Sequence, residues 1–339
     1  MLIVRADGNA KIGAGHLMRC LTVAEAAREQ DAKQNIFVLC ADEASAQLAM
    51  SRGFQTGVLH TDYRSMEEEL PKWDSWIKGD DNVILVDSYY VTDAYLAGLR
   101  RWGRVFLMDD MQEHAYPVDA VVNYNLFADR EVYRALYGEG NVKCLLGSRY
   151  TPLRPQFRHR DYAVRESVQR VLITTGGGDA DNIAGAVLDG IYREDMEFHV
   201  LVGRFSPHSD WWQKRAQGCA NVIVHADVQD MAGLMEQCDL AITAGGSTVY
   251  ELCAVGTPFV AFAYATNQEL LVQYLKDHDI AKSAGMWHRD REAAMGGIQE
   301  AFADLLSCER RRFYSEREHG VVDGLGAVRL ASELCVPKQ

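Results

Sequence analysis

The chain has 339 residues, of which 48% are hydrophobic and 24% are charged, and its formal net charge is −13 at pH 7. This length favours two domains over one, and the apolar content suffices for full cores. The acidic balance argues against nucleic acid or an anionic membrane as the main partner, although a nucleotide site needs only a few local donors.

Predicted strands alternate with helical patterns twice along the chain. We expect strands at 2–5, 35–39, 83–86, 105–108, 120–123 and 143–146, and again at 170–174, 198–202, 222–225, 240–243 and 259–262. Apolar strands joined by helices are typical of a parallel sheet covered on both faces. Prolines and arginines at 151–166 indicate a linker. We predict an α/β protein with two Rossmann-like domains, 1–150 and 167–339, whose parallel sheets face a cleft.

The first predicted strand leads into the segment G-A-G-H at 13–16, and a helical pattern begins near Leu17. Glycines permit a tight turn and a close approach to a ligand. The helix start offers unpaired N–H groups and the positive end of its dipole, which suit an anion. A histidine there is disfavoured as a cation and can accept a proton. The pattern predicts His16 as a general base beside a phosphate-bearing ligand, with an incidental histidine in a plain turn as the alternative.

Two glycine loops follow strands in the second half. The segment T-G-G-G-D at 175–179 could bind an anion through its N–H groups or simply form a tight turn. The segment A-G-G-S-T-V-Y-E at 244–251 is more specific, because it opens a helix that Gly256 and Pro258 end. We expect residues 245–248 to hold a diphosphate and Glu251 to accept the hydroxyls of a ribose. A capping box formed by Thr248 and Glu251 is the alternative.

Further polar groups follow other predicted strands. The amides of Asn267 and Gln268 could hold sugar hydroxyls or acetamido groups, or could cap a helix. Residues 87–89 (D-S-Y) and the pair Asp109-Asp110 also end strands. Paired carboxylates can bind a metal or share a proton, but they are as often turn formers. Because no spacing such as H-E-x-x-H is present, we predict no metal site and no cofactor.

The cysteines give information about the compartment. None of the eight forms a C-x-x-C pair and most lie in apolar stretches, so we interpret them as small buried hydrophobes in a reducing environment. The first strand reaches charged residues at once, unlike a signal peptide, and the apolar stretch at 259–265 is too short to span a bilayer. We therefore predict a cytoplasmic protein without a membrane partner and take it to be a monomer.

As a set, these residues resemble a known family, the UDP-2,4-diacetamido-2,4,6-trideoxy-β-L-altropyranose hydrolases of pseudaminic acid biosynthesis. The resemblance covers nearly the whole chain in order. It rests on residues 5–7, 12–21, 87–89, 108–110, 145–147, 150–157, 176–179, 244–248 with Glu251, 267–268 and 323–327.

The resemblance implies a glycosyltransferase-B-like fold and hydrolysis of the sugar C1–O bond without a metal, with His16 as base on the attacking water. Inversion at C1 and release of UDP and a free sugar would follow. UDP would be held by Gly245, Gly246, Ser247, Thr248 and Glu251, and the substrate by Arg5, Asp7, Gly13, Gly15, Tyr89, Gly177, Asn267 and Gln268. Departures from the family pattern at Ala14, Ser88 and Gly178 leave the base intact and the identity of the sugar open.

Two alternatives remain for the function. An inverting glycosyltransferase of the same fold would use His16 to deprotonate a sugar hydroxyl in place of water. A non-catalytic module that binds nucleotide sugars would keep the loops of the second domain and would not need His16.

Overall fold

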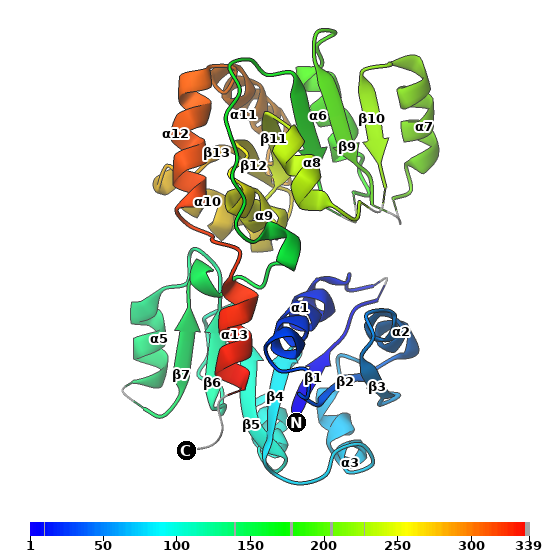
Figure 1. Ribbon diagram of the computed structural model, residues 1–339, viewed down its shortest axis with the longest axis vertical. Coiled ribbons are helices and arrows are strands. Elements are labelled where there is room, and N and C mark those ends of the chain that lie inside the picture. Colours follow the sequence, from blue (N-terminus) through cyan, green and yellow to red (C-terminus); the bar gives the residue numbers. More distant parts are fainter. Residues whose placement is uncertain (10, 139, 177–178, 204–205, 227, 336–339) are drawn as a thin grey trace. The chain divides into compact units, whose positions relative to one another are not determined.

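The computed structural model describes residues 1–9, 11–138, 140–176, 179–203, 206–226 and 228–335. The chain divides into two compact units, which are coloured along the sequence in Figure 1. Unit 1 comprises Met1–Arg154 and Leu325–Gln339, and unit 2 comprises Pro155–Gly324. The predicted domains, with a linker at 151–166 and a second domain running to the end of the chain, differ from these units at both junctions.

The C-terminal helix explains the larger difference. Helix α13 (Gly326–Leu334) packs against α1 (Gly15–Gln30) of unit 1, as Figure 1 shows for the red and dark blue helices. Its apolar side buries Leu330 and Leu334, and the Gln30 side chain donates to the carbonyl of Val328 at 2.7 Å. A Cβ added at Gly326 would lie 2.2 Å from the carbonyl oxygen of Thr151. The last helix therefore completes the core of unit 1.

Unit 1 is built on a seven-stranded parallel sheet in the order β3-β2-β1-β4-β5-β6-β7. The strands are β1 (Leu2–Ala6), β2 (Ile36–Cys40), β3 (Gln55–Val58), β4 (Asn82–Asp87), β5 (Gly103–Met108), β6 (Ala120–Asn123) and β7 (Lys143–Leu146). The other helices are α2 (Glu43–Ser51), α3 (Leu70–Trp73), α4 (Asp93–Leu99) and α5 (Arg130–Tyr137), with 3₁₀ turns η1 (Met66–Glu69) and η2 (Ser148–Tyr150). The strand order reverses between β1 and β4, which is where open α/β sheets bind ligands.

Unit 2 repeats the scheme with a six-stranded parallel sheet in the order β10-β9-β8-β11-β12-β13. The strands are β8 (Arg170–Thr174), β9 (Glu197–Leu201), β10 (Val222–His225), β11 (Leu240–Ala244), β12 (Phe259–Ala263) and β13 (Lys282–Met286). The helices are α6 (Ile183–Ile191), α7 (Ser209–Gly218), α8 (Met231–Gln237), α9 (Thr248–Val255), α10 (Glu269–Asp277), α11 (Arg291–Asp304) and α12 (Cys308–His319), with η3 (Pro155–Phe157) and η4 (Thr266–Gln268). Its switch point lies between β8 and β11.

The predicted fold class, two parallel α/β sheets, is confirmed, and every predicted strand is present. Two edge strands, β3 and β13, have no counterpart in the prediction, because their sequences QTGV and KSAGM lack a continuous apolar run. Among the helices of the described residues, none is long and apolar enough to cross a bilayer.

The core of unit 2 contains a carboxyl group that is fully buried. Glu318 on α12 has no exposed surface, and its Oε1 accepts the N–H of Phe259 at 3.3 Å. Its Oε2 has no hydrogen-bond partner among the described residues. Burial raises the pKa of Glu318 well above its ordinary value, because desolvation disfavours the charged form. Burial in the native state therefore favours the protonated form of this side chain.

Glu318→Gln should make unit 2 more resistant to unfolding as pH rises. In the native protein the proton on Glu318 is retained above the ordinary glutamate pKa of about 4.3, so its stabilising contribution is complete below that pH. It is then lost by about 1.4 kcal/mol per pH unit until the raised pKa of the native state is reached. Glutamine removes this dependence. Denaturant unfolding of the native protein and the variant at several pH values between 5 and 8 checks this prediction. A difference in the free energy of unfolding that stays constant with pH would contradict it.

Candidate active site

The loop after β1 places His16 in the first turn of α1. Gly13 adopts a φ of +74°, which a glycine allows without strain, and its N–H donates to the carbonyl of Asn9 at 2.9 Å. Helix α1 begins at Gly15, and its N-cap residue Ala14 makes no side-chain cap hydrogen bond. A Cβ added at Gly15 would meet no atom within 4 Å, so packing does not require a glycine there. The predicted turn and helix start are thus present, with the histidine at the carboxyl end of the first strand.

His16 is paired with a carboxylate that ends the neighbouring strand β4. Its Nδ1 lies 2.6 Å from Oδ1 of Asp87, and the side chains are 17% and 1% exposed. Burial opposes ionisation of Asp87, but Arg19 and His16 outweigh it and hold the pKa of this carboxyl well below its usual range. An ionised carboxylate accepts the proton on Nδ1, which leaves Nε2 with a lone pair. Within the described residues, no group is hydrogen-bonded to Nε2.

Arg19 lies one helical turn after His16 and fixes the position of Asp87. Its Nη2 donates to Oδ1 of Asp87 at 2.7 Å and to Oδ2 of Asp110 at 2.9 Å, and its Nη1 donates to the Tyr124 hydroxyl at 2.7 Å. Nη2 also lies 3.3 Å from Nδ1 of His16. Nδ1 lies closer to the Asp87 carboxylate than to Nη2, and Nη2 already has two carboxylate acceptors. We therefore assign the proton on Nδ1 to the hydrogen bond with Asp87. Arg19 therefore holds the carboxylate and the carboxylate holds the imidazole.

The histidine opens onto a pocket of about 190 Å³ in unit 1. His16, Asp87, Asp7, Ile12, Ser88, Tyr63, Tyr89 and Tyr90 line it. The Tyr89 ring meets the imidazole edge to face, with centroids 4.6 Å apart, and its hydroxyl donates to Asp110 at 3.2 Å. The pocket thus combines one base with tyrosine rings and hydroxyls, a lining that suits a sugar.

The substrate residues predicted at the end of β1 take two different positions. Arg5 has no exposed surface: its Nε donates to Glu69 at 2.7 Å and its Nη1 to Asp7 at 2.6 Å. A guanidinium enclosed in this way cannot reach a ligand, so the structure corrects its assignment from substrate contact to positioning of Asp7 and Glu69. Asp7, in contrast, lines the pocket while its Oδ1 accepts the N–H of Ala41 at 2.7 Å.

The pair Asp109-Asp110, considered as a metal site, is engaged by protein donors. Asp109 accepts the hydroxyl of Tyr133 at 2.7 Å and the N–H of Met111 at 3.0 Å. Asp110 accepts from Arg19 and from Asn125. In the described part of the chain, no group of three or more metal-binding side chains is found. Independence from metal stays a prediction.

In unit 2, the glycines after β11 serve packing. The N–H of Gly245 donates to the carbonyl of Phe262, and that of Gly246 to the carbonyl of Ala244, both at 2.8 Å. A Cβ at Gly245 would lie 2.5 Å from Cγ2 of Val272, so no larger residue fits there. The hydrogen atoms of both glycine amides are thus used within the protein, and binding of a diphosphate by residues 245–248 stays a prediction.

The start of α9 keeps the capacity to bind an anion. Ser247 is exposed and Thr248 half-buried, and within the described residues neither N–H has a backbone acceptor. Helix α9 begins at Thr248, and the N-cap residue Ser247 makes no side-chain cap hydrogen bond. Thr248 is thus not an N-cap, and the alternative of a capping box with Glu251 is not formed. Glu251 lies half-buried in the first turn.

The amides after β12 also separate into two roles. Asn267 is exposed, whereas Gln268 is buried and its Oε1 accepts the N–H of Tyr264 at 3.0 Å. Gln268 also lies against Gly245, because a Cβ added at Gly245 would be 3.3 Å from the Cβ of Gln268. We therefore assign Gln268 to holding two loops together and keep Asn267 as the candidate for a ligand. Gly177 lies outside the described residues.

Arg19 and the partnership of His16 with Asp87 are missing from the prediction. The spacing of His16 and Arg19 by three residues places them on one helix face, a signal available in the sequence. The carboxylate is brought close because β1 pairs with β4, with Ala6 opposite Asp87. Those two strands are not consecutive in the chain.

Comparisons with known proteins identify the fold. Residues 170–324 match the glycosyltransferase family 28 C-terminal domain. The structure of Acinetobacter baumannii MurG matches with a TM-score of 0.67 at 12% identity and covers 98% of each chain. The chain thus has the glycosyltransferase-B fold and is related, through its second unit, to enzymes that process nucleotide sugars.

Two curated relatives are distant in sequence. The spore coat polysaccharide biosynthesis protein SpsG of Bacillus subtilis is 26% identical over 222 residues, which are 64% of this chain and 64% of that protein. The chain therefore spans about two thirds of that relative's length. The UDP-2,4-diacetamido-2,4,6-trideoxy-β-L-altropyranose hydrolase of Campylobacter jejuni is 23% identical over 278 residues, which are 81% of this chain and 95% of that protein.

Proposed function

We propose that this chain is a metal-independent, inverting hydrolase of a UDP-linked 2,4-diacetamido-2,4,6-trideoxy hexose. It cleaves the sugar C1–O bond and releases UDP and a free sugar for synthesis of a nonulosonic acid of the pseudaminic type. The observation that carries the proposal is the contact of 2.6 Å between His16 and Asp87 at a pocket. The similarity to the Campylobacter hydrolase, which extends over 95% of that protein, supports the substrate class.

Unit 1 supplies the base in this proposal. Nε2 of His16 takes a proton from water as the water attacks C1, and the imidazolium that forms is stabilised by Asp87 through Nδ1. The Asp87 carboxylate stays ionised, because Arg19 holds it by two hydrogen bonds. Water attacks from the side opposite the leaving group, so the configuration at C1 inverts.

Unit 2 binds UDP in this proposal. The N–H groups and hydroxyls of Ser247 and Thr248 bind the diphosphate and take up the charge that develops on it. Glu251 accepts the ribose hydroxyls. A nucleoside diphosphate is already a good leaving group, so one base suffices and the two carboxylates of an ordinary glycosidase are not needed.

Hydrolysis in ¹⁸O-labelled water tests the proposal directly. The purified protein, with a UDP-linked diacetamido-trideoxy hexose and EDTA, should release UDP without an added acceptor. The label should enter the free sugar, because water bonds to C1. Label in the UDP phosphate would mean cleavage of the P–O bond, and loss of activity in EDTA with recovery in Mg²⁺ would refute independence from metal.

An inverting glycosyltransferase is the second candidate, favoured by the match of residues 170–324 to the family 28 C-terminal domain. It would use the same base on an acceptor hydroxyl. UDP release that requires an added sugar acceptor would support it against the hydrolase. A non-catalytic module that binds nucleotide sugars would bind UDP without any release, and the paired His16 and Asp87 would then have no function.

A further inference from the structure

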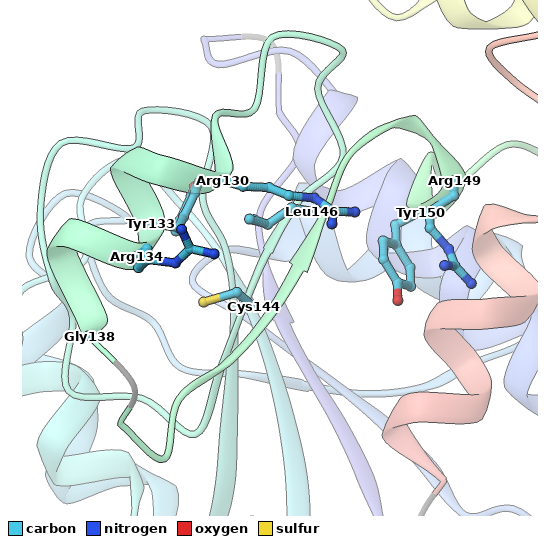
Figure 2. Close-up of a pocket in the computed structure, with 8 residues that line it drawn as sticks. All are labelled: Arg130, Tyr133, Arg134, Gly138, Cys144, Leu146, Arg149 and Tyr150. Carbon is cyan, nitrogen blue, oxygen red and sulfur yellow. The ribbon is translucent and has the colours of Figure 1, made fainter.

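Unit 1 contains a second pocket, which shares no lining residue with the His16 pocket. It has a volume of about 310 Å³ and lies beside the edge strand β7, between helix α5 and turn η2 (Figure 2). Arg130 and Arg134 of α5, Arg149 and Tyr150 of η2, and Cys144 and Leu146 of β7 line it. In Figure 2 the Arg130 side chain extends from α5 across Leu146, and the Cys144 thiol points toward α5.

The pocket is strongly basic on a chain of net charge −13. Arg134 donates to both carboxylate oxygens of Glu131 at 2.8 Å. In the part of the chain that the structure describes, the guanidinium groups of Arg130 and Arg149 have no hydrogen-bond or ion-pair partner, although Arg149 stacks over the Tyr150 ring at 5.2 Å. Two positive charges at the described lining are therefore unbalanced.

This arrangement differs from that of several other arginines of the same unit. Arg5, Arg19, Arg64, Arg100 and Arg101 each form an ion pair with a carboxylate. Unpaired guanidinium groups around a hollow attract an anion, and their planar donors fit phosphate oxygens in pairs. A phosphate dianion balances two charges, whereas a single carboxylate balances one. The Tyr150 ring and Leu146 offer apolar surface to the body of such a ligand.

We propose that this pocket is a binding site for a small phosphate-bearing ligand, with Arg130 as the group that contacts the phosphate and Arg149, which lies beyond the Tyr150 ring in Figure 2, as a further positive charge at its rim. The site is independent of the proposed hydrolysis, because none of its residues takes part in that reaction. It adds a second anion site to the one proposed at the start of α9.

Cys144, which lines the pocket, can report on ligand binding through its reactivity. Cys144 was expected to be buried, but it is exposed at the edge strand, and partial desolvation of its thiol raises its pKa above the usual value. A thiol with a raised pKa is a weak nucleophile that reacts slowly. Its rate of alkylation can therefore be followed over minutes, and a ligand seated in the pocket shields it. Cys308, half-buried in unit 2, serves as an internal reference.

The test measures alkylation of Cys144 by iodoacetamide, quantified by mass spectrometry of the full-length protein after digestion. Inorganic phosphate and glucose 6-phosphate are the probes, with potassium chloride of equal ionic strength as the blank. At about 10 mM probe and a dissociation constant of about 1 mM, the fraction of protein molecules with an empty pocket falls to about a tenth. Alkylation of Cys144 should therefore slow about tenfold. The rate at Cys308 should not change. Stronger protection by glucose 6-phosphate indicates a phosphate ester as ligand, and equal protection indicates free phosphate.

The double variant Arg130→Gln/Arg149→Gln should lose the protection. Both residues are exposed, so it should fold, and its melting temperature verifies this. Arg193→Gln removes a positive charge from an exposed pair with Asp195 in unit 2 and should keep the protection. Two results would overturn the proposal: no protection of Cys144 in the native protein by either probe, or equal protection in the double variant.

Discussion

His16→Asn should lower turnover by about 10²–10⁴-fold, the usual contribution of a general base. Asparagine can keep a hydrogen bond with Asp87, but its amide cannot take a proton from water at neutral pH. UDP affinity should stay within a few-fold, because the proposed UDP site lies in unit 2 and His16 in unit 1. Single-turnover UDP release and UDP titration by calorimetry check the two parts separately.

The chain offers a matched control for that experiment. His114 is also paired with an aspartate, since its Nε2 lies 2.9 Å from Oδ1 of Asp93, but both side chains are more than half exposed and neither lines the pocket of His16. His114→Asn should leave turnover unchanged. Near-normal turnover of His16→Asn, or an equal loss in both variants, would refute the assignment of His16 as the base.

The fold could be predicted from the sequence wherever strands are continuous apolar runs. The buried strands β1, β4 and β11 are recognisable from their own residues. Two of the edge strands, β3 and β13, are not, because their sequences lack a continuous apolar run, which an edge strand facing solvent does not need; the edge strands β7 and β10 were recognisable. The C-terminal helix was assigned to the wrong unit for a related reason: its apolar stripe specifies burial but does not specify the partner helix.

The candidate site was predictable only in part. The glycine turn and the helix start identify His16 by local chemistry alone. Its partner Asp87 lies 71 residues away and becomes adjacent only through the pairing of β1 with β4. Arg5 was misassigned because a charged residue beside a ligand loop looks the same in sequence whether it faces a ligand or a buried Glu69. The acceptors of the glycine amides after β11 were not predictable either, because they come from the end of β11 itself and from the neighbouring strand β12.

Asp87→Asn should reduce turnover about as strongly as loss of the base, by about 10²–10⁴-fold. The neutral amide removes the charge that stabilises the imidazolium, and its NH₂ group can turn toward Nδ1 and leave the proton on Nε2, where it blocks proton acceptance. The variant also takes one carboxylate from Arg19, so the melting temperature should fall.

Asp110→Asn separates these two effects. Asp110 accepts from Arg19 at 2.9 Å, like Asp87, and from the Tyr89 hydroxyl at 3.2 Å, but no hydrogen bond between described residues joins it to His16. Loss of either carboxylate weakens the hold on Arg19, whereas only loss of Asp87 releases the imidazole. We therefore expect both variants to melt earlier and Asp87→Asn to lose far more turnover than Asp110→Asn at equal loss of stability. Equal losses of turnover would mean that Asp87 acts through Arg19 and the architecture of the site, and that the proton on Nδ1 is not what prepares His16 to accept one from water.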